Sequence, residues 1–265
     1  MFDEKRGHYT KISLDATKKI QFHSNGHGRP VMTMLANLLV ACLSFRVAPT
    51  RSRMIMASVT SATIPAAAKE ALSVCRKAAR TKEAEPEAVC AALLEVEKTM
   101  RAAAKDDGGA ISRATLEALD GAWRLVFTTG TLDTQNKIGK INYFPLRATQ
   151  SFDTSTMRIT NGIYVGEFAL LKFFGEFQWL EDRRKLEFDF DQIALLGLTF
   201  DLPRGGAEGL GAASGLGSKN NVKLAKEGKK AFFNWIFADE EVALARGGGG
   251  GLALWRRDTE MEASA

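Results

Sequence analysis

From Gly121 onward the chain alternates between apolar and polar residues, which is the pattern of β-strands that bury one face. In "WRLVFTT" the apolar residues Trp123, Leu125 and Phe127 occupy every second position. The segment "GEFQWLEDRRKLEFDF" (175–190) repeats this alternation in two arms, with a turn at 181–184. The pattern predicts about eight or nine short strands that are joined mainly by hairpins.

A sheet of this kind loses its exposed edges when it closes on itself. We therefore predict a mainly β fold, an antiparallel β-barrel preceded by short α-helices. The interior of an eight-stranded barrel is filled by side chains or holds one small ligand. The bulky residues expected to line it, and to bind such a ligand, are Trp123, Phe127, Phe152, Phe177, Trp179, Phe188 and Phe190. Plain core packing is the alternative for each of them.

The chain before Gly121 has a helical composition, rich in Ala, Glu, Lys and Arg. Pro65 and Pro86 suit the first turns of two helices over 65–82 and 86–105. Ser112 is the expected N-cap of a third helix over 112–119. The predicted layout is a helical prelude (62–110), a barrel (111–258) with a glycine-rich loop (204–219), and a short tail (259–265).

Residues 1–61 have the composition of a targeting leader. The apolar stretch "VMTMLANLLVACL" (31–43) is shorter than the about twenty residues that span a bilayer. Residues 44–61 carry arginines and hydroxyl groups but no acidic residue. This order predicts a signal peptide followed by a plastid transit peptide, with an N-terminal tail around a short buried helix as the alternative.

The net charge of +5 first suggests an anionic partner, but its distribution does not support one. Residues 1–60 hold nine of the 36 Lys and Arg residues and three of the 31 Asp and Glu residues. The rest of the chain is therefore close to neutral, and nucleic acid is not an expected partner.

Histidine and cysteine are absent after residue 90. This absence argues against a His- or Cys-based zinc site, a Cys–His nucleophile or a Ser–His–Asp triad in the barrel. Asp189 and Asp191 lie on one strand face and could serve hydrolysis or cation binding. Because alternation places them opposite the aromatic face, a solvated outer face is the preferred interpretation. We expect no catalytic residue, no metal site and no cofactor.

The run "ALARGGGGGLALWRR" (243–257) has five glycines between arginines and invites comparison with phosphate-binding loops. Such loops open a helix, whereas an apolar strand pattern follows Gly251. The run therefore predicts a final β-hairpin with a glycine turn, its arginines facing water or lipid headgroups.

These segments, taken in order, resemble the plastid lipid-associated protein/fibrillin family in its algal form. The resemblance rests on "LDGAWRLVFTTG" (119–130), "NYFPLRATQSFD" (142–153), "MRITNGIYVG" (157–166), "RRKLEFDFDQI" (183–193) and "FNWIFADEEVALARGGGGGLALWRR" (233–257). It covers residues 112–257, and the glycine-rich loop departs from it. The positions that match family motifs are Trp123, Gln150, Asn161, Asp239, Arg246 and Gly251. For Asp239 and Arg246 we expect an ion pair or a polar contact at the barrel mouth, or else a solvated pair of charges.

The resemblance implies a lipocalin-like barrel in the plastid (chloroplast), at plastoglobules or thylakoid membranes. It also implies a non-enzymatic protein that binds or organises carotenoids, prenylquinones or other lipids. The alternative is a scaffold or assembly factor of photosynthetic complexes, with a filled barrel and no ligand. The clusters "LLKFF" (170–174) and "FFNWIF" (232–237) suit strand core, or aromatic contacts with a membrane surface.

Overall fold

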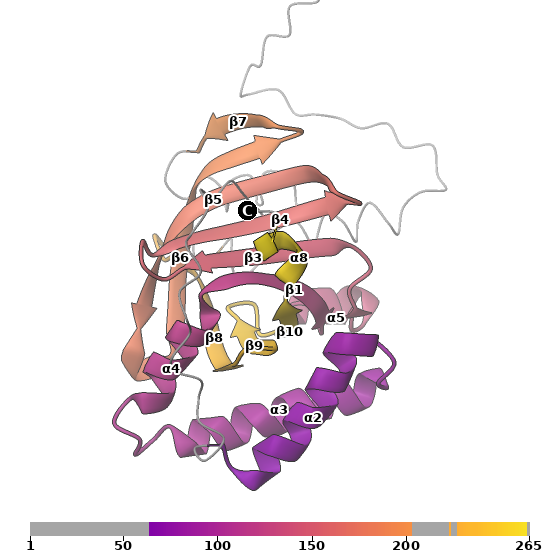
Figure 1. Cartoon of the computed structure of the whole chain (residues 1–265), viewed down its shortest axis with the longest axis vertical. Helices are drawn as coiled ribbons and strands as arrows, with labels where there is room; N and C mark the ends of the chain where they lie inside the picture. The colour runs from indigo at the N-terminus through magenta and orange to yellow at the C-terminus, as the bar shows by residue number, and fades with distance from the viewer. Residues whose placement is uncertain (1–63, 203–222, 224–226, 264–265) are drawn as a thin grey trace, which may run out of the picture.

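Eight antiparallel strands close into a barrel, which confirms the predicted fold class (Figure 1). The structure is a computed structural model and describes residues 64–202, 223 and 227–263. The barrel strands are β1 (Gly121–Thr128), β3 (Arg147–Asp153), β4 (Arg158–Val165), β5 (Phe168–Leu180), β6 (Lys185–Leu195), β8 (Ala231–Ala238), β9 (Val242–Gly247) and β10 (Leu252–Arg257). Each strand pairs with the next in this order, and β10 returns to pair with β1.

Helices precede and cover one side of this barrel (Figure 1). They are α2 (Ala66–Thr81), α3 (Pro86–Ala103) and α4 (Ala110–Leu119), close to the predicted ranges. Two short helices were not predicted, α5 (Leu132–Ile138) and α8 (Thr259–Ala263), the latter in the expected tail. Among the described helices, none combines the length and the apolar content required of a membrane-spanning segment.

The N-cap prediction for Ser112 was wrong. The N-cap of α4 is Gly109, and the Asp107 carboxylate before it accepts hydrogen bonds from the backbone N–H groups of Gly109 (2.9 Å) and Ile111 (2.6 Å). The Ser112 hydroxyl is buried and donates to the Glu181 carbonyl at 2.8 Å. Ser112 therefore joins α4 to the turn between β5 and β6.

The barrel wall separates two apolar clusters. One fills the interior, and the other lies between the outer wall and helices α2 and α3. Along β9, Ala243 and Ala245 belong to the interior cluster, whereas Val242 and Leu244 belong to the outer one. Strands beneath the helices are thus apolar on both faces, which explains the weak alternation there.

Phe127 is the one predicted lining residue that lies in the outer cluster, so its placement in the interior was wrong. The register between β1 and β10 shifts between Leu125 and Phe127, which marks a β-bulge or similar irregularity. An extra residue in a strand reverses the side-chain alternation beyond it. Trp123 and Leu125 therefore point inward, while Phe127 packs under the helices.

Two further short strands lie off the closed path. β2 (Asn142–Tyr143) pairs with the end of β1, and β7 (Leu198–Asp201) pairs with β6. β6 contacts β7 through residues 192–195 and β8 through residues 185–188, in the same antiparallel sense. β7 and β8 therefore lie end to end along one edge of β6. All four residues of β7 are exposed, so Leu198 and Phe200, which alternate with Thr199 and Asp201, are not buried by the described part of the chain.

The five-glycine run forms the turn of the hairpin between β9 and β10, which confirms its prediction as a β-hairpin. The turn packs against the start of α5, since the Leu132 N–H donates to the Gly249 carbonyl at 3.0 Å. A Cβ at Gly251 would overlap the Gly130 carbonyl oxygen. Close backbone approach, rather than phosphate binding, accounts for glycine at this position.

Two predictions lie outside the described residues. These are the leader over 1–61 and the glycine-rich loop over 204–219.

Candidate ligand site in the barrel interior

Aromatic rings dominate the barrel interior and contact one another around its wall. Phe152 lies 6.0 Å from Phe177 and 5.5 Å from Trp235 between ring centroids, both edge to face. Phe188 lies 5.3 Å from Phe190 and stacks on Phe233 at 5.3 Å. The structure thus brings five of the seven predicted lining residues into the interior cluster: Trp123, Phe152, Phe177, Phe188 and Phe190. Trp179 is partly buried and packs against this cluster from its edge.

Five interior aromatics were missing from the predicted lining set, namely Phe144, Phe173, Phe233, Trp235 and Trp255. Part of their signal was present in the sequence, because Phe233 and Trp235 alternate along one strand and Trp255 follows Leu252 and Leu254. Bulges lie between Trp235 and Phe237 and between Phe174 and Gly175. These irregularities blur the period-two pattern in the strands that carry three of the five residues.

The indole N–H groups of Trp123 and Trp179 have protein partners. Trp123 Nε1 donates to the Leu119 carbonyl at 2.8 Å, and Trp179 Nε1 donates to Ser112 Oγ at 3.2 Å. Both bonds tie α4 to one end of the barrel.

The indole N–H groups of Trp235 and Trp255 are different. Both are buried, and neither has a hydrogen-bond acceptor among the described residues. The two rings lie 5.3 Å apart between centroids, so two donors without acceptors occur in adjacent side chains of the interior. A buried donor without an acceptor costs about 1–3 kcal/mol. Nearly all buried donors in folded proteins have an acceptor, so two donors without one in the protein point to water or a ligand as their partner.

Gln150 and Asn161 form the polar part of the interior wall. They are directly opposite each other in the pairing of β3 with β4, and both are almost fully buried, at 0% and 2% exposure. Gln150 also lies opposite Trp123, and Asn161 opposite Phe173, both members of the interior cluster. Two of the four polar motif positions therefore lie next to the aromatic lining.

Asp239 and Arg246 do not meet as an ion pair, so that expectation was wrong. Asp239 pairs with Arg76 of α2, and Arg246 pairs with Glu97 of α3 at 2.5 Å. The Asp239 carboxylate also accepts from the backbone N–H groups of Glu241 and Val242, each at 2.8 Å. These motif positions hold the helices on the barrel wall rather than forming a barrel mouth.

The contact between α3 and β9 shifts the ionisation of both partners. The hydrogen bond from Arg246 holds the pKa of the Glu97 carboxyl below its usual value, against the opposing effect of burial. The same bond raises the pKa of Arg246. Both groups are therefore charged at neutral pH, as expected for a structural ion pair.

The acidic residues considered for catalysis lie on the outer face. Phe188 and Phe190 are buried in the interior. Asp189, between them, is partly exposed, and Asp191, beyond them, is exposed and pairs with Arg158 at 3.3 Å. Within the part of the chain that the structure describes, no cluster of three or more His, Cys, Asp or Glu side chains could hold a metal ion. Burial raises the pKa of the Cys75 thiol to about 12, so this thiol is protonated at neutral pH.

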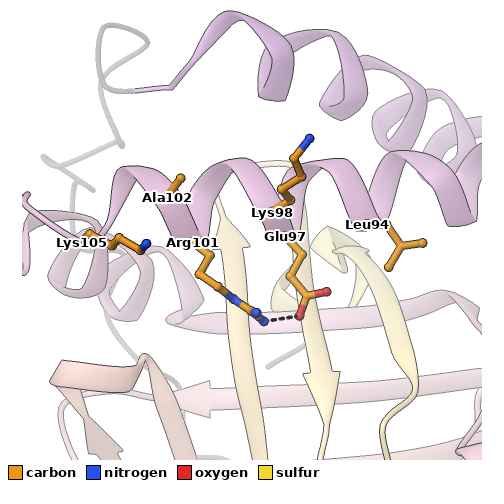
Figure 2. A pocket seen from close by; sticks show the side chains of 6 residues that line it. All are labelled: Leu94, Glu97, Lys98, Arg101, Ala102 and Lys105. Atoms are coloured by element: carbon orange, nitrogen blue, oxygen red, sulfur yellow. Dashed lines mark hydrogen bonds and ion pairs between the residues drawn. The ribbon is translucent and has the colours of Figure 1, made fainter.

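A shallow hollow of about 330 Å³ lies along α3, outside the barrel (Figure 2). The described residues that line it come from this helix and the turn after it: Leu94, Glu97, Lys98, Arg101, Ala102 and Lys105. Arg101 contacts Glu97 at 3.0 Å, and Figure 2 shows Lys98 directed away from this pair. Glu97 is thus committed to structural contacts, and the hollow offers mainly exposed basic side chains.

Comparison with protein-family models, curated proteins and solved structures gave no match for this chain. The family resemblance therefore stays a prediction that rests on the sequence segments themselves.

Proposed function

We propose that this protein is a non-enzymatic lipid-binding protein of plastids, whose barrel holds an isoprenoid with an oxygen-bearing end group. Prenylquinones and oxygenated carotenoids belong to this class. The observation that carries the proposal is the pair of buried indole N–H groups on Trp235 and Trp255. The plastid location rests on the resemblance and on the predicted leader.

The two indoles favour an acceptor oxygen on a largely apolar molecule. Both donors belong to the aromatic interior cluster, so an incoming acceptor must enter apolar surroundings. A carbonyl or hydroxyl oxygen on an apolar body satisfies the donors while its hydrocarbon part contacts the rings. An ionised group is disfavoured, because the rings around the two donors form an apolar environment.

Quenching of tryptophan fluorescence by a short-tailed prenylquinone tests this proposal. All four tryptophans of the chain lie in or against the interior cluster, so a bound quinone would quench them. The variant Trp235→Phe/Trp255→Phe removes both donors and keeps Trp123 and Trp179 as reporters. Loss of two hydrogen bonds should raise the quinone concentration for half-quenching about tenfold or more.

The matched control is Trp179→Phe, which removes an indole N–H that already has a partner at the barrel edge. This variant should bind the quinone as the unaltered chain does. Equal binding by the double variant, or no quenching of the unaltered chain together with no co-purified pigment, quinone or lipid in mass spectrometry, would refute the proposal.

An exposed apolar rim supports association with a lipid surface. We give this name to Val165, Phe168, Leu195, Leu196, Leu198 and Phe200, all of them exposed. Val165 pairs with Phe168 in one hairpin, and the Leu196 N–H donates to the Leu170 carbonyl, which joins this hairpin to the next. A contiguous apolar patch on the surface commonly marks a binding site, and shallow insertion into a membrane is one use of it.

Flotation with liposomes tests the role of the rim. Phe168→Ser/Phe200→Ser should reduce the floating fraction severalfold. Leu94→Ser, which alters an apolar residue of similar exposure on α3, should leave it unchanged. Undiminished flotation of the rim variant would exclude the rim as the contact.

The dense ring contacts of the interior favour a second candidate, a scaffold or assembly factor whose barrel is filled. The apolar rim would then contact a photosynthetic complex. Co-migration with a photosystem on a native gel, without bound pigment or quinone, would favour this function over lipid binding.

A further inference from the structure

Two arginines lie directly opposite each other on the outer wall of the barrel. Arg124 of β1 pairs in register with Arg256 of β10. Their neighbours Trp123, Leu125 and Trp255 belong to the interior cluster, so Arg124 and Arg256 project from the outer face. Side chains directly opposite each other in an antiparallel pair have Cβ atoms about 4.5–5.5 Å apart, and like charges in this position are destabilising.

Neither guanidinium has a hydrogen bond or ion pair with a described residue, and both side chains are half-buried. This is unusual for the chain, because Arg76, Arg246 and Arg257 all reach acidic partners. Buried arginines are usually paired, since their charge is costly to remove from water.

A third cation completes the group at the end of α2. Lys82 is the C-cap residue of this helix, and its ammonium donates to the Phe144 carbonyl at 3.0 Å. Partial burial, followed by the charges of Arg124 and Arg256, lowers the pKa of Lys82. The pKa of Arg124 is lowered by burial and then by the charge of Arg256. The three cations thus affect one another electrostatically.

The acidic groups nearby are engaged by another residue. Asp258 and Glu260 favour the charged form of Arg124, but both pair with Arg147, at 3.5 and 3.8 Å. Arg147 itself adds a further positive charge that acts on Arg124. An excess of positive charge therefore remains on this part of the wall.

We propose that Arg124, Arg256 and Lys82 form a binding site for a phosphate group. Two adjacent guanidinium groups can bind phosphate oxygens in a bidentate manner, and the lysine ammonium adds a point charge. A phosphate that bridges the two arginines converts a repulsive pair into an attractive arrangement. The site lies on the outer wall and does not rest on the proposed interior ligand. Its phosphate could belong to a soluble molecule or to a lipid headgroup.

Thermal unfolding at constant ionic strength tests the site. Inorganic phosphate and glycerol phosphate serve as soluble probes, with sodium chloride as the reference salt. At about ten times its Kd, a phosphate ligand should raise Tm by about 3–5 °C for a domain of this size. Arg124→Gln/Arg256→Gln should abolish this rise. Lys82→Gln, at an exposed position, should reduce it.

The control Lys98→Gln/Arg183→Gln removes two positive charges from exposed positions elsewhere and should keep the full response. Without phosphate and at low salt, Arg124→Gln/Arg256→Gln should be at least as stable as the unaltered chain, because a repulsive pair is removed. If the arginines instead stabilise the fold, the double variant should be less stable than the unaltered chain.

Vesicles distinguish the source of the phosphate. Binding to phosphatidylglycerol vesicles but not to phosphatidylcholine vesicles, lost in Arg124→Gln/Arg256→Gln, would assign the site to a headgroup. A Tm rise with soluble phosphates alone would assign it to a soluble ligand. Absence of both responses, or an equal response in the double variant, would overturn the proposal.

Discussion

The four tryptophans of the barrel differ in whether the indole N–H has a hydrogen-bond partner. Trp123 and Trp179 donate to the polypeptide, and Trp235 and Trp255 do not donate to any described residue. The four residues share a similar apolar environment. The difference therefore distinguishes the N–H groups that bond within the fold from those that we propose to bind a ligand.

Replacement of these residues by phenylalanine should make the separation measurable. Trp123→Phe leaves the buried Leu119 carbonyl without its donor and should lower the free energy of unfolding by about 1–3 kcal/mol beyond the loss of ring volume. Trp255→Phe removes a donor that lacks an acceptor and should cost less in the ligand-free protein. Urea denaturation of both variants checks the order, and a larger cost for Trp255→Phe would contradict it.

Among the elements, the hairpin between β9 and β10 shows that neighbouring glycines differ in their constraints. A Cβ at Gly247 would lie 3.8 Å from the nearest atom of the Phe233 ring, an ordinary contact. A Cβ at Gly251 would overlap the backbone of Gly130. The run looks uniform in sequence, but only particular positions in it require glycine.

Alanine substitution tests this difference. Gly247→Ala should change stability by less than about 1 kcal/mol, whereas Gly251→Ala should lower it by about 1–3 kcal/mol, because the hairpin must move away from α5. Thermal unfolding of the two variants measures the difference. Equal Tm values would show that the turn is free to shift.

The attachment of α3 to β9 depends on one carboxylate. Glu97 is 12% exposed and bonds to Arg246, so Glu97→Gln should lower the free energy of unfolding by about 1–3 kcal/mol at pH 7. The folded-state pKa of Glu97 lies below the unfolded value of 4.5. Its contribution is therefore present above pH 4.5 and is lost as the pH falls through the folded-state pKa.

The same helix provides a control for this prediction. Glu95→Gln alters a more exposed carboxylate that pairs with Lys98 at 3.4 Å, and should cost less than about 0.5 kcal/mol. Denaturation curves between pH 3 and pH 7 should show a weaker acid dependence for Glu97→Gln than for Glu95→Gln. The same acid dependence in both variants would show that Glu97 does not contribute to the loss of stability at low pH.

On the scale of the whole molecule, the barrel and the helical prelude share one core. Phe127, Leu244 and Leu254 project outward from the barrel and are buried by α2 and α3. The barrel wall therefore has an apolar outer face that water would reach without the helices.

A chain that begins at Ala110 should expose this face. We expect it to aggregate in gel filtration, or to bind a hydrophobic dye such as ANS, because a large apolar patch becomes accessible. A chain that begins at Ala62 keeps both helices and should remain monomeric or as assembled as the full chain. A soluble, cooperatively folded chain from Ala110 would contradict the shared core.

The sequence was sufficient to predict the closed barrel, the two long helices and five interior aromatic residues, since alternation indicates which face of a strand is buried. It placed Phe127 on the wrong side, because a bulge depends on the pairing with β10 and not on the local pattern. The partners of Asp239 and Arg246 were not predictable either. They lie 163 and 149 residues away in the chain, where no local spacing connects them.

The end-to-end placement of β7 and β8 along β6 means that the chain leaves the sheet after Asp201 and returns to the same line at Ala231. One edge of β6 thus pairs with two separate strands rather than with one continuous strand. Joining their ends through a longer segment costs little, since each doubling of a loop adds only about 0.6 kcal/mol. This position is therefore a natural point for a domain insertion or for new termini in a circularly permuted chain, provided that β6 and β8 still pair to close the barrel.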